Sequence, residues 1–306
     1  MRHLILHIGH GKTGTSFIQS VLSINSQRLN TVGLYYPYHQ SFQKAKEGHI
    51  SSGNGALLDD EKFIVPDGHK TLLSKEQLFH TLLMEDNLYQ KAIKRSDKLE
   101  LILYTRDVME VLSSSWGQSL KRGGNTESFS EYIAKNQDPH HRKVLRWLEA
   151  SQQNNLKIII RNYSQTKDKL IDDFIDQVLP ERSIDIDLEL PKTATVNRSL
   201  TKIEYEIQRI MNTIDKKLAI QLSDGLVNTL PNVRSSIAQT DPDTFYRAQE
   251  KYQPIIDQIN RHLPANQALK FGDEEIFVNS KSEEYTLSSS QLDIIESVLS
   301  NKFKAP

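Results

Sequence analysis

Short apolar runs alternate with stretches of helical periodicity along the first two thirds of the chain. Runs typical of buried strands occupy residues 3–8, 70–74, 99–104 and 156–161, and a shorter extended segment, 33–37, ends at a proline. Their unbroken apolar character fits strands that are covered on both faces. Apolar positions at helical spacing lie between and after these runs, at residues 15–29, 75–93, 108–120, 129–135, 142–152 and 168–179. Strands separated by helices predict an α/β fold with a mostly parallel sheet flanked by helices.

The pattern changes after Pro191. Strand-like runs disappear, and helical periodicity dominates near residues 200–218, 245–263 and 288–299. We therefore expect an α/β core over residues 1–195 and a helical C-terminal extension over residues 196–306 that packs on this core. A chain of 306 residues is long enough to bury a core of that size.

A glycine-rich turn, residues 9–16 (GHGKTGTS), connects the first expected strand to the first expected helix. Its glycines let backbone N–H groups approach an anion, the helix start adds partial positive charge, and Lys12 adds a full one. A Walker A loop has the spacing G-x-x-x-x-G-K-[ST]. Counted back from Gly11 and Lys12, its first glycine would stand where this chain has Leu6. The turn therefore predicts a P-loop-like anion site that is not an ordinary nucleoside triphosphate loop.

Polar residues also follow the other expected strands, at 74–76, 106–107 and 163–164. Ligands of open parallel sheets bind beyond the carboxyl ends of the strands, so these residues are expected to line one crevice. Ser114 lies eight residues after Arg106, about two helical turns on, and the two side chains suit a second phosphate. Taken alone, the pair is weak evidence and is better explained by a surface serine and an ion pair from Arg106 to Asp107 or Glu110.

Three motifs in order resemble the sulfotransferase family. Residues 8–16 resemble the family's 5′-phosphosulfate loop, typically P-K-[ST]-G-[ST]-[ST], although Gly11 replaces the usual proline. Residues 104–114 resemble its 3′-phosphate motif. Residues 162–164 (NYS) fall where the family often has Tyr-Glu-Asp, although Ser164 replaces the acid. The layout, including residues 196–200 (VNRSL), is similar to bacterial members that modify carbohydrates.

The resemblance implies a sulfuryl donor, 3′-phosphoadenosine 5′-phosphosulfate, and a product, 3′-phosphoadenosine 5′-phosphate. It implies that residues 1–195 bind this nucleotide. The expected nucleotide-binding residues are Gly11, Lys12, Thr13, Gly14, Thr15, Ser16, Arg106, Ser114, Tyr163 and Arg198. The expected acceptor is a small molecule or carbohydrate with a hydroxyl or amine group, and no metal is required.

The expected catalytic residues are Lys12 and one general base. Lys12 would donate to the leaving oxygen, while backbone N–H groups of residues 13–16 hold the 5′-phosphate. An alcohol has a high pKa, so its proton needs a positioned acceptor. Glu76 is the first candidate because it follows the end of an expected strand, and His49, in a glycine-rich loop, is the second. An acid in the first turn of a helix and an exposed loop histidine are the competing interpretations of these two residues.

Composition narrows the class of partner. The chain has 38 Lys and Arg against 39 Asp and Glu, a net charge of −1, which argues against nucleic-acid binding driven by bulk charge. It has no cysteine, so disulfides and thiolate metal sites are excluded and a reducing, cytoplasmic location is expected. No apolar segment approaches the roughly 18 residues of a membrane span. The sequence predicts no particular oligomeric state.

Two other functions remain open from the sequence. A P-loop kinase with an atypical loop would need a Walker B aspartate, whereas the strand at 99–104 runs into Arg106. A non-catalytic nucleotide-binding scaffold would use the helical extension to bind a partner, and its activity would survive Lys12→Ala.

Overall fold

The computed structural model describes residues 1–48, 52–81, 86–135, 139–153, 156–181, 186–191, 198–278 and 286–303. By its internal contacts the chain forms two compact units that alternate along the sequence. One, here called the sheet unit, contains Met1–Asp107, Asp138–Ala194 and Ile255–Leu269. The other, the helical unit, contains Val108–Gln137, Thr195–Pro254 and Lys270–Pro306. The division at residue 195 into a core and an extension stays a prediction.

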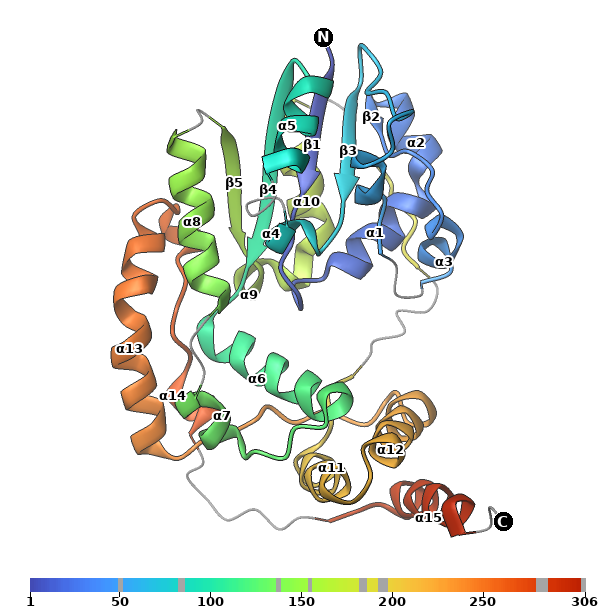
Figure 1. Ribbon diagram of the computed structural model, residues 1–306, viewed down its shortest axis with the longest axis vertical. Coiled ribbons are helices and arrows are strands. Elements are labelled where there is room, and N and C mark those ends of the chain that lie inside the picture. The colour runs from blue at the N-terminus through green and yellow to red at the C-terminus, as the bar shows by residue number, and fades with distance from the viewer. Residues whose placement is uncertain are drawn as a thin grey trace. The chain divides into compact units, whose positions relative to one another are not determined.

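The sheet unit is built on five parallel strands (Figure 1). They are β1 (His3–His7), β2 (Leu34–Tyr35), β3 (Lys70–Ser74), β4 (Lys98–Thr105) and β5 (Lys157–Asn162). Their order across the sheet is β2-β3-β1-β4-β5. The predicted α/β fold with a mostly parallel sheet is confirmed, and the segment at 33–37 supplies the edge strand β2.

Helices cover the sheet because both of its faces are apolar. Ile5, Leu72 and Ile102 point to one face, where they pack with residues of α1 (Thr15–Ile24) and α10 (Leu170–Val178). The alternate strand residues, such as Leu6 and Leu101, point to the other face and are equally buried. The remaining helices of this unit are α2 (Ser26–Thr31), α3 (Phe42–Lys46), α4 (Leu78–Thr81), α5 (Asp86–Arg95), α8 (Pro139–Gln153) and α9 (Tyr163–Thr166), with short 3₁₀ turns at Gly55–Leu58, Lys167–Lys169 and Ala265–Gln267.

One helix expected as continuous is divided in the sheet unit, and residues 82–85, between α4 and α5, lie outside the described residues. The helix expected over 15–29 breaks at Asn25, whose side-chain amide donates to Val21 O within α1 and to Glu189 O outside it, each at 2.8 Å. The helix expected over 75–93 is represented by α4 and α5. Ser74, which precedes that stretch, ends β3, and its hydroxyl lies 2.9 Å from the buried His7 Nδ1.

The helical unit contains α6 (Val108–Gln118), α7 (Phe129–Lys135), α11 (Lys202–Ile214), α12 (Lys216–Thr229), α14 (Glu274–Phe277) and α15 (Ser289–Phe303), with a π-helical turn at Ser119–Gly123. The helix expected over 200–218 is two helices, because Asp215 has an extended backbone and accepts from the N–H groups of Lys217 and Leu218 to start α12. Another helix, α13 (Pro242–Asn260), contributes residues to both units. Within the described residues, no helix is both long and apolar enough to cross a membrane.

Candidate functional site

The turn between β1 and α1 has an unusual backbone. Lys12 has φ 71° and is the one non-glycine residue with positive φ among those the structure describes. A left-handed conformation costs an L-residue about 1–2 kcal/mol, so the surroundings must hold it. Gly14 also has a positive φ, of 75°. A side chain there would overlap Leu170 and lie 3.1 Å from the ring of Tyr163, so Gly14 is required on two grounds.

Three consecutive carbonyl groups of this turn accept hydrogen bonds from side chains. His10 O accepts from Thr13 Oγ1 at 2.7 Å, and Gly11 O lies 2.9 Å from His10 Nδ1. Lys12 O accepts from the Arg106 guanidinium at 3.1 Å. These three carbonyl oxygens are engaged by protein donors, which reduces their repulsion of a negative ligand.

The start of α1 lacks a side-chain cap. Its N-cap residue is Gly14, and its first hydrogen bond joins the Ile18 N–H to Gly14 O at 3.0 Å. Within the described part of the chain, the N–H groups of Thr15, Ser16 and Phe17 have no acceptor. Unpaired N–H groups at a helix start, beside a lysine, fit an anionic group such as a phosphate or sulfate.

Arg106 and Tyr163 adjoin the turn from the ends of β4 and β5. The Arg106 guanidinium lies over the Tyr163 ring, 5.2 Å from its centroid, while it also donates to Lys12 O. Asn162 caps α9 by accepting from the Ser164 N–H at 3.0 Å, and its amide donates to Asp107 Oδ1 at 3.0 Å. These bonds tie the ends of the two strands together and hold Tyr163 at the turn.

Glu76 reaches the same turn from the end of β3. A side-chain atom built on Gly11 would lie 2.7 Å from Glu76 Oε1, so the carboxylate rests directly on this glycine. Although Glu76 is exposed as a residue, desolvation of its carboxyl group against the turn raises its pKa, and the positive charge of Lys12 acts in the opposite direction. The structure thus brings Glu76 together with Lys12, Arg106 and Tyr163. His49, the second candidate base, lies outside the described residues.

Ser114 and Arg198 belong to the helical unit. Ser114 is half-buried on α6. Arg198 is buried, and all five of its N–H groups have acceptors: both oxygens of Glu204 and the carbonyl groups of Ser199, Leu226 and Leu230. The guanidinium is therefore fully engaged within its own unit, and the function proposed below does not use Arg198.

His10 is the residue of this turn that sequence reasoning passed over. Its side chain is 0% exposed and contacts the rings of Phe79 and His140, at centroid distances of 5.4 and 5.3 Å. A histidine between two loop glycines resembles an exposed residue in sequence, and only the fold shows that it is buried. Among the described residues, no group of three His, Cys, Asp or Glu side chains is placed to hold a metal ion.

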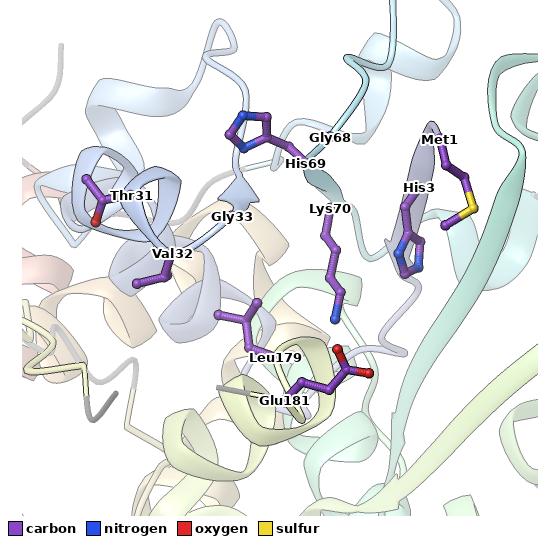
Figure 2. Close-up of a pocket in the computed structure, with 10 residues that line it drawn as sticks. All are labelled: Met1, His3, Thr31, Val32, Gly33, Gly68, His69, Lys70, Leu179 and Glu181. Carbon is purple, nitrogen blue, oxygen red and sulfur yellow. The ribbon is translucent and has the colours of Figure 1, made fainter. Parts of the chain in front are cut away.

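A cavity of about 550 Å³ lies at the amino ends of β1 and β3 (Figure 2). Its lining includes His3 and Lys70, the first residues of β1 and β3, and Leu179 and Glu181, which follow α10. None of the residues expected to bind a nucleotide lines it. The turn that is the candidate anion site is a separate feature, at the carboxyl ends of the strands.

Comparison with known proteins finds similarity among solved structures. No family model matches the sequence, and no curated protein matches it. A solved structure of a sulfotransferase from Alicyclobacillus acidocaldarius is similar over 86% of this chain and 96% of that one, with 13% identity and a TM-score of 0.40.

Proposed function

We propose that the protein is a sulfotransferase that moves a sulfuryl group from 3′-phosphoadenosine 5′-phosphosulfate to a hydroxyl or amine acceptor, a carbohydrate or glycoconjugate. The observation that carries the proposal is the uncapped start of α1 beside the left-handed Lys12, with the turn's carbonyl oxygens engaged elsewhere. The order of the three sulfotransferase-like motifs supports this donor over other anions.

In this proposal the N–H groups of Thr13 to Ser16 hold the 5′-phosphate of the donor substrate. Arg106 and Tyr163, which stack on each other beside the turn, bind its adenosine 3′-phosphate end. Ser114, in the helical unit, belongs to the family's 3′-phosphate motif by resemblance alone. Charge-assisted hydrogen bonds of this kind are short and strong, and an arginine suits a phosphate because its donors form a planar fork.

The chemistry requires one bond to form and one to break. The acceptor oxygen or nitrogen attacks the sulfur, the bond from sulfur to the bridging oxygen breaks, and the electron pair stays on that oxygen. Lys12 donates to this oxygen as its negative charge grows. Glu76 takes the acceptor's proton, with His49 as the alternative base. Lys12 serves Glu76 as well, because its positive charge opposes the rise in the Glu76 pKa and favours the carboxylate form that a base needs.

The decisive experiment is a calorimetric titration of the protein with 3′-phosphoadenosine 5′-phosphate without metal, and separately with ATP and magnesium. We expect micromolar binding of the first ligand and weaker binding of the second. A preference for ATP with magnesium would replace the proposal by a kinase. If neither ligand binds, the protein lacks this nucleotide site, and the scaffold function would replace the proposal. The cytoplasmic location is part of the proposal and rests on the absence of cysteine.

A charge-matched pair of variants locates the binding site. Lys12→Met removes a positive charge from the turn, and Lys46→Met removes one from the exposed end of α3. A hydrogen bond to a charged group contributes about 1.5–3 kcal/mol, so Lys12→Met should weaken nucleotide binding by roughly 10- to 150-fold. Lys46→Met, with the same net charge, should bind like the wild type. Equal loss in both variants would mean that bulk charge, and not the turn, attracts the nucleotide.

A further inference from the structure

His10 lies at the inner side of the anion-binding turn, in the sheet unit. Besides its contacts with Phe79 and His140, its Nε2 lies 3.4 Å from the hydroxyl oxygen of Thr105, the last residue of β4. The next residue, Arg106, donates to Lys12 O. His10 therefore links the turn to the strand end from which Arg106 also reaches the turn.

The contacts of His10 determine which ring nitrogen carries the proton. Burial, reinforced by the neighbouring His140, lowers the pKa of His10 well below its ordinary value, so the ring is neutral near pH 7. The Gly11 carbonyl, 2.9 Å from Nδ1, accepts but cannot donate, so Nδ1 carries the hydrogen. Nε2 is then an acceptor, and the Thr105 hydroxyl donates to it.

This hydrogen bond orients a peptide group. All described peptide bonds are trans, so the Lys12 N–H points opposite to the Gly11 C=O to which it is coupled. With the Gly11 oxygen drawn toward the buried ring, the Lys12 N–H is directed away from it. In the same way, the Thr13 hydroxyl donates to His10 O and so directs the Gly11 N–H. The Arg106 guanidinium donates to Lys12 O and so directs the Thr13 N–H.

We propose that His10 is a positioning residue for the donor nucleotide: its Nδ1–H sets the plane of the peptide between Gly11 and Lys12, and so shapes the turn for an anion before the ligand binds. A turn shaped in advance loses less conformational freedom on binding, and binding is tighter for that reason. The inference rests on the proposed function, because the ligand it serves is the proposed nucleotide.

The competing role for a buried ring is simply to fill space, and two substitutions separate the roles. His10→Asn keeps a donor nitrogen bonded to Cγ, as Nδ1 is, but loses most of the ring. His10→Phe keeps the ring volume but has no donor. A positioning role predicts that Asn preserves nucleotide affinity within about threefold and that Phe weakens it by about fivefold or more. A space-filling role predicts the reverse order.

The measurements are nucleotide affinity by calorimetry and the melting temperature of each variant. Phe79→Leu is the control, because it changes the packing against the His10 ring without touching the hydrogen bond. It should lower the melting temperature with little change in affinity. If His10→Phe prevents folding, His10→Gln is used in its place. The donor nitrogen of Gln is one carbon further from the backbone than that of Asn, so His10→Gln should bind the nucleotide less tightly than His10→Asn. Phe or Gln variants that bind as tightly as the Asn variant would overturn the proposal.

A second measurement separates this inference from the proposed function. Amide hydrogen exchange of the peptide covering residues 9–16, recorded without ligand, reports how firmly the turn is held. We expect faster exchange in His10→Phe than in His10→Asn, whether or not the wild type binds the nucleotide. Failure of the wild type to bind, with this order of exchange retained, would reject the sulfotransferase and leave the role of His10 in the turn. Equal exchange in the two variants would reject that role.

Discussion

Replacing Arg198 by Met should lower the free energy of unfolding of the helical unit without weakening nucleotide binding. The Arg198 side chain is 3% exposed and forms two hydrogen bonds with Glu204, whose side chain is 0% exposed. Met retains much of the apolar volume, so the chief loss is the positive charge and its donors. The carboxylate of Glu204 then stays buried without its counter-ion.

The structure sets the expected size of this loss. Removing one partner of a buried ion pair typically costs about 3–5 kcal/mol. Glu204 would still accept from the Thr201 N–H at 2.8 Å and from Gln291 Nε2 at 2.7 Å. Two remaining donors place the loss near the lower end, about 3 kcal/mol.

The loss should also depend on pH. Burial alone raises the pKa of Glu204, but hydrogen bonds from Arg198 and Gln291 outweigh it and hold the pKa below its ordinary value. In the wild type this carboxylate therefore adds stability above its unfolded pKa, and that stability is lost as the pH falls through the folded pKa. Without Arg198 the pKa of Glu204 in the folded protein rises, because fewer hydrogen bonds oppose the effect of burial. The difference between the two proteins should then shrink as the pH is lowered toward about 4.

Urea unfolding followed by Trp116 fluorescence measures the effect. The chain has two tryptophans, and a Trp147→Phe background leaves Trp116, which lies in the helical unit with its ring 4.8 Å from Tyr205. Arg209→Met is the matched control, on α11, the helix that carries Glu204. Arg209 pairs with the half-exposed Glu206 at 2.7 Å, so its loss should cost less than about 1 kcal/mol.

One result would refute the reasoning. If Arg198→Met unfolds at the urea concentration of the control and loses nucleotide affinity tenfold, Arg198 acts on the nucleotide, as the sequence led us to expect. The buried ion pair would then have no measurable share in the stability of the helical unit.

Two further predictions concern the anion-binding turn. In thermal unfolding, Gly14→Ala should destabilise the sheet unit by about 1–3 kcal/mol more than Gly33→Ala. Both glycines have positive φ, but a side chain at position 14 overlaps Leu170, whereas one at position 33 meets open space. Equal losses of stability in the two variants would contradict the overlap. Glu76→Gln should lower turnover at saturating donor by about 100-fold or more while nucleotide affinity changes little. Desolvation raises the Glu76 pKa, so as the pH is lowered the wild-type turnover should begin to fall at a higher pH than it would with an ordinary glutamate as the base. Near-normal turnover of Glu76→Gln would exclude Glu76 as the base.

The strands of the fold were predictable because a strand buried on both faces is an unbroken apolar run in the sequence. The run at 70–74 matches β3 residue for residue. The run at 99–104 is one residue shorter than β4 at each end, and the run at 156–161 begins and ends one residue before β5. The helix boundaries were less predictable. Asn25 and Asp215 each break a continuous apolar period through side-chain bonds to backbone groups.

The candidate anion site could be proposed from the sequence for a related reason. A glycine-rich turn between a strand and a helix with a lysine in it depends on neighbouring residues, so its chemistry is local and visible in sequence. The meeting of Glu76, Arg106 and Tyr163 at that turn depends on strand order, which places β3 and β4 on either side of β1. The sequence indicated that strand ends would converge but did not specify this order.

His10 and Arg198 show where the sequence alone stops. By itself the sequence determined an α/β fold and a glycine-rich, lysine-bearing turn after the first strand, because periodicity and a local glycine pattern carry that information. Only the tertiary structure decided that His10 is buried against the Gly11 carbonyl, and that Arg198 is enclosed by Glu204 and backbone carbonyl groups. Burial and hydrogen-bond partners of a polar side chain are set by residues distant in sequence, such as Thr105 for His10 and Leu230 for Arg198.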